Sequence, residues 1–453
     1  MTDDSFDVIV IGAGPAGEVA AGRLAQHGRR VALVERELVG GECSFFACMP
    51  SKALLRPGEL LDEVARVPGV DASGVDAAAT LRRRDEVIHG LSDDGQMPWL
   101  RERGVTLLRG HARLAGERRV EVEGVGVCEA REAVILATGS GTLLPPIPGL
   151  AESQPWTNRE GTTSDDVPAE LVVLGGGVVG VELAQAWSTL GARVTLIEAA
   201  ERLIAREEPF ASAQVAEGLQ RRGVELRIGA RATQVAREGE RTTVTLEDGG
   251  QVSGDALLVA IGRRPRTDDL GLDTVGLQPG GLVEVGDDLR VADRPWLYAI
   301  GDVNGRALLT HMGKHQARLA TAQICGDEGA RLGAVDGAQS PRAIFTDPGV
   351  AAVGHTLASA QAAGIAAHAV DRPTSGTAGA SFHGRDAPGT TRFVLDAERE
   401  LLVGATFVGP DVAELLHAAT IAIAGEVPLA TLAYAVPAFP TRSELWLDLR
   451  AGD

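Results

Sequence analysis

Two cysteines behind a pair of glycines form the clearest chemical feature of the sequence. The stretch GGECSFFACMPSK, residues 40–52, holds Cys43 and Cys48, with four residues between them. Two thiols this close can be metal ligands, a structural disulfide or a redox pair. Four cysteines in 453 residues are too few for a disulfide scaffold. The spacing therefore favours a catalytic or metal-binding pair.

Length, charge and the N-terminal residues limit the class of protein. A chain of 453 residues is long enough for two to four domains. Its formal charge of −19 disfavours nucleic acid and anionic membranes as partners and favours a small or neutral one. The start, MTDDSFDVIVIGAG, lacks the basic region of a secretory signal, and no apolar run is long enough to span a membrane. We therefore expect a cytoplasmic protein.

A first dinucleotide-binding unit is predicted at the N-terminus. Residues 7–17, DVIVIGAGPAG, form a short apolar strand pattern that runs into a helical pattern, and the strand RVALVE follows. The glycines of such a loop let the backbone approach a pyrophosphate at the helix N-terminus, and the acid ending the second strand can accept hydrogen bonds from a ribose. These residues are Gly12, Gly14, Gly17 and Glu35.

The same unit recurs at residues 170–199. It again gives strand, glycine loop, helix and strand, with Gly175, Gly177, Gly180 and the terminal acid Glu198. Two such units imply two dinucleotides, usually a flavin and a nicotinamide, because hydride transfer needs a donor and an acceptor. A carboxylate at position 198 would bind a free 2′-hydroxyl and repel a 2′-phosphate, which favours NAD(H) over NADP(H). The nearby Arg202 could weaken this preference.

The remaining pattern predicts an α/β fold with two Rossmann-like dinucleotide-binding domains and a C-terminal α+β dimerisation domain. Short strands are expected over residues 104–139, and a Pro-rich stretch then marks a boundary. The segment LYAIGDVNG should return the chain to the first dinucleotide site. The predicted domains are an FAD-binding domain (1–150), an NAD(P)-binding domain (151–267), the second part of the FAD or central region (268–338) and a dimerisation domain (339–453).

The motifs together resemble those of a known family. DVIVIGAGPAG, GGEC-x4-C-x-PSK, ILATGS, GGG-x-x-G, AIGRRP, AIGD and FTDPGVAAVG occur in order from about residue 6 to residue 447. The set is similar to that of the class I pyridine nucleotide-disulfide oxidoreductases, which include dihydrolipoamide dehydrogenase, glutathione reductase and mercuric reductase. The resemblance implies a homodimeric FAD flavoprotein that uses NAD(P)H. It also favours the redox interpretation of the cysteine pair over metal ligation, for which too few ligands are present.

The resemblance also implies roles for individual residues. Cys43 would exchange with substrate, and Cys48 would lie against the flavin as a thiolate, stabilised by the N-terminal end of the following helix. Lys52 would lie near flavin N5 with Glu182 as its ion-pair partner, and Asp302 would bind the ribityl hydroxyls. Further cofactor-binding positions are expected at Gly41, Thr138, Gly139 and Gly262.

The C-terminal motif departs from the family. Most members carry HPT-x-S-E, whose histidine, oriented by the glutamate, acts as acid and base at the partner subunit's cysteines, whereas this chain reads FPTRSE from Phe439 to Glu444. A phenyl ring can take no proton, and losing a general base costs about 10² to 10⁴ in rate. Glu444 is left to hydrogen-bond the backbone or Arg442. The histidines at 311, 315 and 417 fit ordinary surface or interface positions, and Phe45 and Phe46 are expected to pack in the core instead of lining the pocket.

The sequence gives one leading function and three less favoured ones. The leading hypothesis is an FAD oxidoreductase that passes electrons between nicotinamide, flavin, the Cys43/Cys48 pair and a small disulfide, dithiol or other acceptor, in either direction. The alternative is a diaphorase that reduces quinones directly from the flavin. Soft-metal reduction is less favoured, because the chain ends LDLRAGD without a C-terminal cysteine pair. A noncatalytic flavoprotein subunit is disfavoured by the intact cofactor loops.

Overall fold

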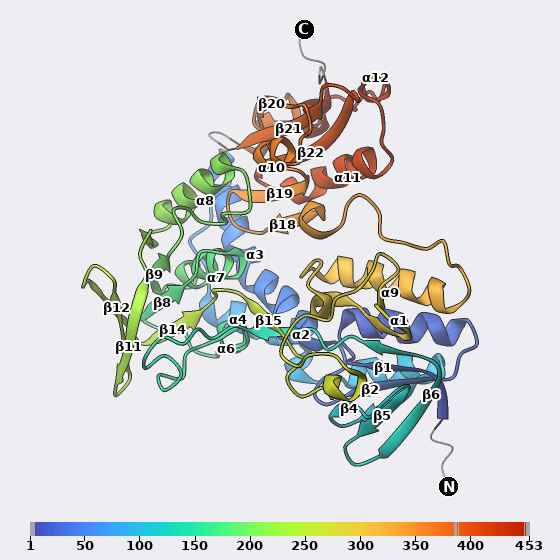
Figure 1. Ribbon diagram of the computed structural model, residues 1–453. Helices are drawn as coiled ribbons and strands as arrows, with labels where there is room; N and C mark the ends of the chain where they lie inside the picture. The colour runs from blue at the N-terminus through green and yellow to red at the C-terminus, as the bar shows by residue number, and fades with distance from the viewer. Residues whose placement is uncertain (1–4, 385–386, 388, 448, 450–453) are drawn as a thin grey trace. The chain divides into compact units, whose positions relative to one another are not determined.

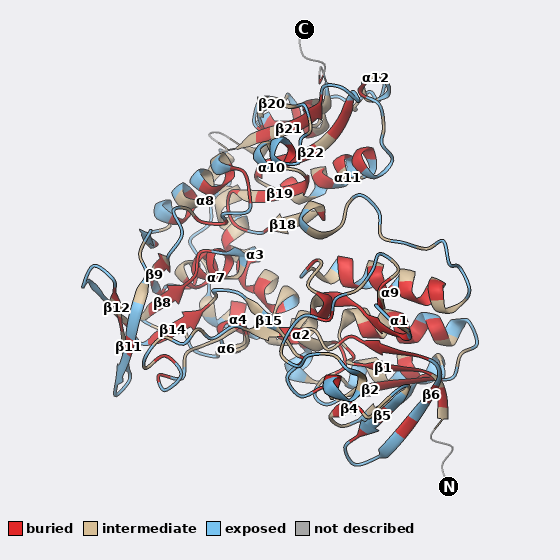
Figure 2. Ribbon diagram, viewed as in Figure 1, coloured by how far each residue is buried: buried red, intermediate tan, exposed pale blue. Residues whose placement is uncertain are grey.

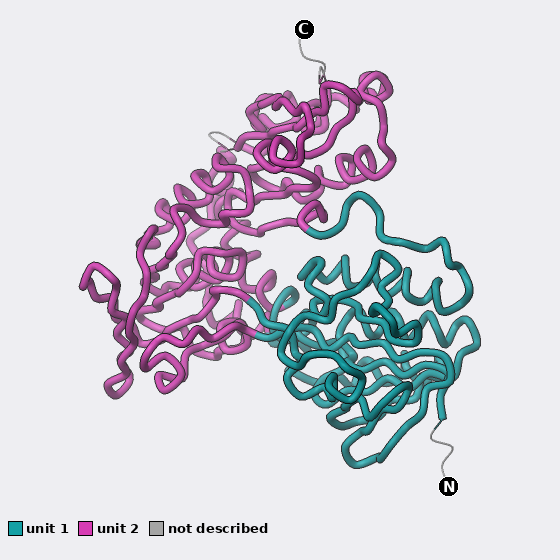
Figure 3. Tube along the Cα trace, in the orientation of Figure 1, with its two compact units in different colours: residues 1–49, 85–141, 263–337 teal, residues 50–84, 142–262, 338–453 magenta. Residues whose placement is uncertain are grey.

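The computed structural model describes residues 5–384, 387, 389–447 and 449. The chain forms two compact units, each built from three separate stretches of sequence (Figure 3). Unit 1 comprises residues 1–49, 85–141 and 263–337. Unit 2 comprises residues 50–84, 142–262 and 338–453.

Unit 1 is built around one large sheet (Figure 1). Its strand order is β16-β17-β6-β1-β2-β3, and the strands from β17 to β3 are parallel. The antiparallel strands β4 and β5 join through β6. The strands are β1 Ser5–Ile11, β2 Val31–Glu35, β3 Thr106–Arg109, β4 Ala112–Leu114, β5 Arg119–Val122, β6 Gly126–Leu136, β16 Arg290–Val291 and β17 Arg294–Ala299.

Both faces of this sheet are covered, which explains why its strands are continuous apolar runs. Side chains alternate along β1, so Val8 and Val10 pack with helices α1 (Pro15–Gln26) and α9 (Thr310–Ile324). Ile9 and Ile11 face the opposite way and pack with residues of β4 and β5. Figure 1 shows α1 and α9 side by side along one face.

Unit 2 contains a second parallel sheet of order β10-β9-β8-β14. Helix α7 packs against β8 and β9, and its residues share a large core with α8 (Figure 2). A separate antiparallel sheet has the order β11-β12-β13. The bounds are β8 Glu170–Leu174, α7 Val178–Thr189, β9 Arg193–Glu198, α8 Pro209–Arg221, β10 Glu225–Ile228, β11 Ala232–Glu238, β12 Arg241–Leu246, β13 Gln251–Gly254 and β14 Ala256–Val259.

The C-terminal part of unit 2 is an antiparallel sheet of order β18-β19-β22-β21-β20. Helix α11 packs against β19 and β22. The rings of Phe393 and Phe407 pack edge to face, with 5.6 Å between their centroids. The ring centroid of Trp446 lies 5.0 Å from that of Phe393. The bounds are β18 Arg342–Ile344, β19 Gly349–Gly354, α10 Leu357–Ala362, β20 Ala367–Pro373, β21 Thr390–Asp396, β22 Leu401–Gly409, α11 Leu416–Ala424 and α12 Leu429–Leu432.

Shorter elements and the helices that carry the motif residues complete the fold. They are α2 Gly41–Phe45, α3 Cys48–Arg66, α4 Ala77–Val87, α5 Met97–Glu102, β7 Ser140–Thr142, α6 Asn158–Thr163 and β15 Arg263–Pro265, with β7 and β15 paired.

The structure confirms the predicted fold class, with two Rossmann-type βαβ units and a C-terminal α+β portion. The strands expected over residues 104–139 form β3 to β6. The segment LYAIGDVNG does return to the first sheet, because β17 pairs with β6. Within the described part of the chain, no helix combines the length and apolar character that crossing a bilayer requires.

Candidate functional site

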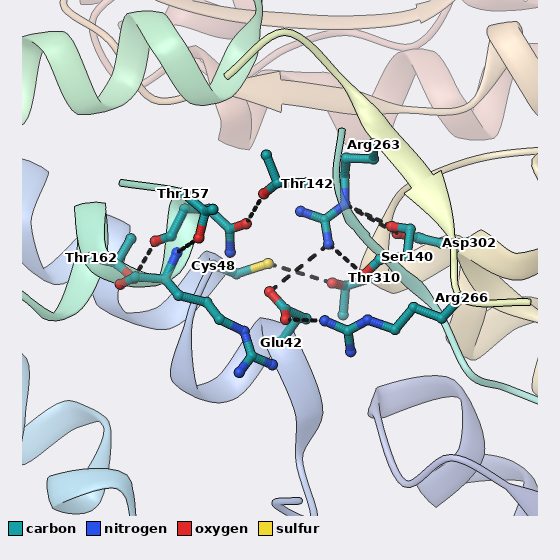
Figure 4. Close-up of polar contacts among 12 residues, drawn as sticks. Glu42, Cys48, Ser140, Thr142, Thr157, Thr162, Arg263, Arg266, Asp302 and Thr310 are labelled. Atoms are coloured by element: carbon teal, nitrogen blue, oxygen red, sulfur yellow. Dashed lines mark hydrogen bonds and ion pairs between the residues drawn. The ribbon is translucent and has the colours of Figure 1, made fainter. Parts of the chain in front are cut away.

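The two motif cysteines come together in unit 1. Cys43 lies in the short helix α2, and Cys48 is the first residue of α3. Both are half-buried thiols, and they hydrogen-bond to each other. The Cys48 Sγ lies 3.4 Å from the Thr310 Oγ1 and shares a hydrogen bond with it (Figure 4). The sequence predicted both cysteines near one helix N-terminus, and this holds for Cys48, whereas Cys43 sits on a separate helix.

The environment of Cys43 favours its neutral form. The hydrogen bond with Cys48 is the largest cause of a pKa well above the ordinary range of a thiol, and burial adds to it. The hydrogen bond to Thr310 and the charge of Lys314 act in the opposite direction. Because the raising effects dominate, Cys43 keeps its proton at neutral pH.

Helix α2 is held by the two phenylalanines that follow Cys43. Phe45 and Phe46 are buried, and they form a small apolar cluster with Ile88 and the partly buried Leu38. Their rings contact each other at 6.3 Å between centroids. The prediction that these residues pack inside the protein is therefore confirmed.

The lysine of the PSK motif forms an ion pair within unit 2. The Lys52 Nζ lies 2.6 Å from the Glu182 Oε2, and the Glu182 side chain is only 4% exposed. The other oxygen of Glu182 accepts a hydrogen bond from the Phe345 amide at 2.9 Å. The Phe345 ring also lies 4.7 Å from the Lys52 ammonium, a cation–π distance. Lys52 is thus oriented by a buried carboxylate and an aromatic face.

The first glycine loop has the geometry of a phosphate-binding turn. A Cβ on Gly17 would collide with the carbonyl oxygen of Gly12, so β1 and α1 can approach closely only with glycine there. Gly14 is the N-cap of α1, and a Cβ on it would project into open space. Gly41 packs against Gly14, since a Cβ at 41 would lie 2.8 Å from the Gly14 Cα. The Glu35 Oε2 accepts a hydrogen bond from the Ala13 amide at 2.7 Å.

The ATGS and AIGD motifs meet in the same unit. The Thr138 Oγ1 is buried without a hydrogen-bond partner among the described residues, as expected for a group that binds a ligand. Gly139 has φ +68°, a conformation that favours glycine. The Ser140 hydroxyl donates to Asp302 at 2.5 Å, and the Arg263 Nε donates to the Ser140 Oγ at 2.6 Å. The open α1 N-terminus and the orphaned threonine hydroxyl fit FAD.

Glu18 is a titratable group of unit 1 that the sequence did not single out. It lies in the first turn of α1, where burial raises its pKa to about 7, against the opposing charge of Lys314 and with a further raising contribution from Glu35. A carboxyl with this pKa changes charge near neutral pH.

The second glycine loop repeats the first in unit 2. A Cβ on Gly180 would collide with the carbonyl oxygen of Gly175, and Gly177 is the N-cap of α7, again facing open space. Gly262 has φ +146° and accepts a hydrogen bond from the Leu143 amide at 3.0 Å. These are the features that suit a second dinucleotide at the α7 N-terminus.

The acid and the arginine after β9 are both engaged with backbone groups. The Glu198 carboxylate accepts hydrogen bonds from the amides of Gly176 at 2.5 Å and Ala200 at 2.6 Å. Arg202 donates to the carbonyl oxygens of Glu207 and Ala205 at 2.8 and 2.6 Å. Arg202 therefore binds its own loop.

The C-terminal motif lies in unit 2. The Phe439 side chain is exposed, with 78% of its surface accessible. Glu444 accepts a hydrogen bond from the Gly379 amide at 3.4 Å, which confirms the backbone alternative expected for it. Of the histidines considered, 311 and 417 are exposed, and burial followed by the charge of Arg318 lowers the pKa of His315.

Sequence reasoning missed the partners that surround the motif residues. The cysteine pair is contacted by Thr310, and Lys52 by Phe345. The arginines at 263 and 266 are contacted by Glu42. The sequence positions of these three residues do not indicate which residues they contact, although Glu42 lies inside the cysteine motif. Over the residues that the structure describes, no three His, Cys, Asp or Glu side chains are grouped to hold a metal ion.

Two glycine loops at open helix N-termini and a thiol pair define a two-dinucleotide oxidoreductase. Residues 6–329 match the family model described as pyridine nucleotide-disulphide oxidoreductase, and residues 340–450 match the dimerisation domain of that family. The chain belongs to the pyridine nucleotide-disulphide oxidoreductase family and is an FAD-dependent enzyme of that class.

Individual relatives span nearly the whole chain. Dihydrolipoyl dehydrogenase of Chlamydia muridarum is 32% identical, over 98% of this chain and 96% of the relative. Mercuric reductase of Lysinibacillus sphaericus is 30% identical, over 93% of this chain and 78% of the relative. The structure of RclA, described as an HOCl-induced flavoprotein disulfide reductase from Escherichia coli, superposes with a TM-score of 0.84 at 25% identity, over 97% and 98% of the two chains.

Proposed function

We propose that this enzyme passes electrons from NADH through FAD to the Cys43/Cys48 pair and then to a small disulfide. The observation that carries the proposal is the hydrogen-bonded thiol pair, with Cys48 at the N-terminus of α3. A thiolate at that position is stabilised by the positive end of the helix. The reverse direction, oxidation of a small dithiol, uses the same groups.

Reduction of the substrate proceeds by two successive thiol–disulfide exchanges after the enzyme disulfide has been reduced. FAD, when bound, would supply the hydride transfer from nicotinamide. The enzyme disulfide gains two electrons and one proton, its S–S bond breaks, and it becomes a thiol on Cys43 and a thiolate on Cys48. The Cys43 thiolate then attacks the substrate disulfide, forms a mixed disulfide and releases the first thiolate. Cys48 attacks the Cys43 sulfur, restores the enzyme disulfide and releases the second thiolate.

The protein's own groups have separate tasks in these steps. Because Cys43 holds its proton and Cys48 accepts a hydrogen bond, the negative charge of the reduced pair belongs on Cys48. Lys52, fixed by Glu182, would supply a positive charge to the flavin when it is bound. Water or the substrate takes the proton of Cys43, since Phe439 can accept none.

The cofactor assignments follow from the loops. Thr138, Gly139, Asp302 and the first loop would hold FAD, with Glu35 on its ribose. Glu198 would bind the ribose of NADH, and because Arg202 is engaged with its own loop, it supplies little attraction for a 2′-phosphate. We assign residues 1–150, 151–267, 268–338 and 339–453 to FAD-binding, NAD(P)-binding, central and dimerisation domains. A cytoplasmic homodimer is part of the proposal.

Anaerobic titration of the purified flavoprotein with NADH tests the proposal. A long-wavelength charge-transfer band at one equivalent, before the flavin bleaches, is expected because a Cys48 thiolate would donate electron density to the bound flavin. NADPH should give the same band at a much higher concentration. Immediate bleaching without the band would contradict a redox-active pair.

Direct reduction of quinones from the flavin is the second candidate. The observation that favours it is the replacement of the C-terminal base by the exposed Phe439. The variant Cys43→Ser separates the two functions. It should abolish disulfide reduction, whereas quinone reduction by a diaphorase would survive at the wild-type rate.

A further inference from the structure

Glu42, the residue directly before Cys43, forms an ion pair with two arginines of unit 1. Its Oε1 accepts a hydrogen bond from the Arg266 Nη2 at 2.7 Å, and its Oε2 lies 3.9 Å from the Arg263 Nη2 (Figure 4). The side chains of Glu42 and Arg266 are 16% and 30% exposed, so the pair is partly shielded from solvent. An ion pair in such a position is stronger than one on the surface.

The helix that carries Glu42 and Cys43 needs external support. Helix α2 has five residues, and its N-cap Gly40 has φ +117°; the described residues provide no side-chain cap for it. A helix this short is unstable by itself. Its C-terminal end is fixed by the burial of Phe45. Glu42 is the matching attachment at the N-terminal end, and Cys43 lies between the two.

The arginines are themselves fixed to the motifs assigned to FAD. The Arg266 amide donates to the Gly139 carbonyl oxygen at 3.1 Å. The Arg263 Nη2 donates to the Ser140 carbonyl oxygen at 2.9 Å, and its Nε lies 3.7 Å from Asp302. The two arginines that hold the Glu42 carboxylate are therefore themselves fixed by hydrogen bonds to Gly139 and Ser140, in the ATGS motif assigned to FAD.

We propose that the Glu42–Arg266 ion pair positions Cys43 for sulfur exchange with Cys48. This inference rests on the proposed redox function of the pair. Glu42 and Arg266 are positioning residues: they fix the first turn of α2, and through it the distance and angle between the two sulfurs. Small displacements of reacting atoms cost about 10- to 100-fold in rate, so the loss of one attachment is measurable.

The variants Glu42→Gln and Arg266→Met test this. Each should lower the charge-transfer absorbance of the NADH-reduced holoenzyme at least about twofold and slow disulfide reduction about 10- to 100-fold, with little change in KM for NADH. Iodoacetamide labelling of the reduced protein, located by peptide mass, should show altered alkylation of Cys43. Arg266→Lys should recover most of the band, because Arg266 donates to Glu42 through Nη2 and a lysine ammonium can take the place of one nitrogen donor.

Arg264→Met is the matched control. Arg264 lies in the same segment but is 51% exposed and pairs with the exposed Asp268. It should leave the band and the rate unchanged. The double variant E42Q/R266M should be no worse than E42Q alone, since that change already weakens the pairing of Glu42 with both arginines.

The outcomes separate the two ideas. If the wild type gives no charge-transfer band, the proposed function fails. If the wild type gives the band and E42Q and R266M keep it at full amplitude with normal alkylation and rate, the positioning role is wrong. Additive losses in the double variant would also contradict it. A fall in FAD content or melting temperature in all three single variants, the control included, would point to a general structural role instead.

Discussion

The Lys52 ammonium and the Glu182 carboxylate are 2.6 Å apart, and both oxygens of that carboxylate are used. One accepts from Lys52 and the other from the Phe345 amide, so the carboxylate cannot turn without breaking a hydrogen bond. The Phe345 ring adds a cation–π contact to the same ammonium. The lysine of the PSK motif is thereby held in one orientation by a segment far away in sequence.

Replacing Lys52 should damage both stability and hydride transfer. Lys52→Met leaves a buried carboxylate without its cation, which costs about 3–5 kcal/mol for a fully buried pair and about 1–3 kcal/mol here, because Lys52 is 35% exposed. Flavin reduction by NADH in stopped flow should slow at least tenfold, by loss of a positioned charge. The control Arg56→Met, one turn along α3 and exposed, should reduce flavin normally.

Thr310 should stabilise, through its hydroxyl, the thiolate of the reduced cysteine pair. Its hydroxyl lies 3.4 Å from the Cys48 Sγ, and its hydrogen bond to Cys43 lowers the pKa of that thiol. In Thr310→Val the charge-transfer band should weaken and require a higher pH, because a charged sulfur loses a hydrogen-bond partner. Thr310→Ser keeps the hydroxyl and should behave as wild type. Equal spectra for the valine and serine variants would show that the hydroxyl has no such role.

The rate of Cys43 alkylation should keep rising at pH values above the ordinary pKa of a thiol. The hydrogen bond with Cys48 and burial raise the pKa of Cys43, so its thiolate is scarce at pH 7 and increases as pH rises above the usual value of about 8.5. Iodoacetamide labelling of the reduced enzyme, followed from pH 6 to pH 10, should still be increasing at pH 9. A plateau reached below pH 8 would contradict the raised pKa.

Glu198 should set the choice of nicotinamide cofactor. Glu198→Ala removes the carboxylate assigned to the ribose and two hydrogen bonds to the loop, so kcat/KM for NADH should fall about tenfold or more. The ratio of NADH to NADPH use should fall as well, since the negative charge no longer repels a 2′-phosphate. Glu201→Ala, at an exposed position in the same loop, is the control and should keep the wild-type ratio.

Restoring a base at the C-terminal motif should speed thiol exchange. Phe439→His places an imidazole on an exposed side-chain position, and a general base contributes about 10²- to 10⁴-fold where it is well placed. Disulfide reduction by the variant dimer should rise at least tenfold at pH 7, while quinone reduction stays unchanged. Tyr434→His, an equally exposed change in the same segment, should give no gain. A Phe439→His variant without any gain would show that position 439 is remote from the exchange.

Much of the fold could be predicted because the decisive signals are local. Glycine loops, apolar strand runs and terminal acids lie within about thirty residues of one another, so their spacing alone identifies each βαβ unit. The same holds for Cys43, Cys48 and Lys52, which share one motif on α2 and α3. Burial of Phe45 and Phe46 also followed from their type, since large apolar side chains are most often inside.

The partners of these residues came from the tertiary structure. Thr310 meets Cys48 across 262 positions of sequence, Arg266 meets Glu42 across 224, and Phe345 meets Glu182 across 163. Such contacts depend on how whole elements pack, and no local pattern encodes them. The sequence by itself determined the family, the two glycine loops and the close cysteine pair. Only the tertiary structure decided which side chains contact the cysteine pair, Lys52 and helix α2. Hydrogen bonds and ion pairs act over a few ångströms, and only folding brings residues so distant in sequence that close together.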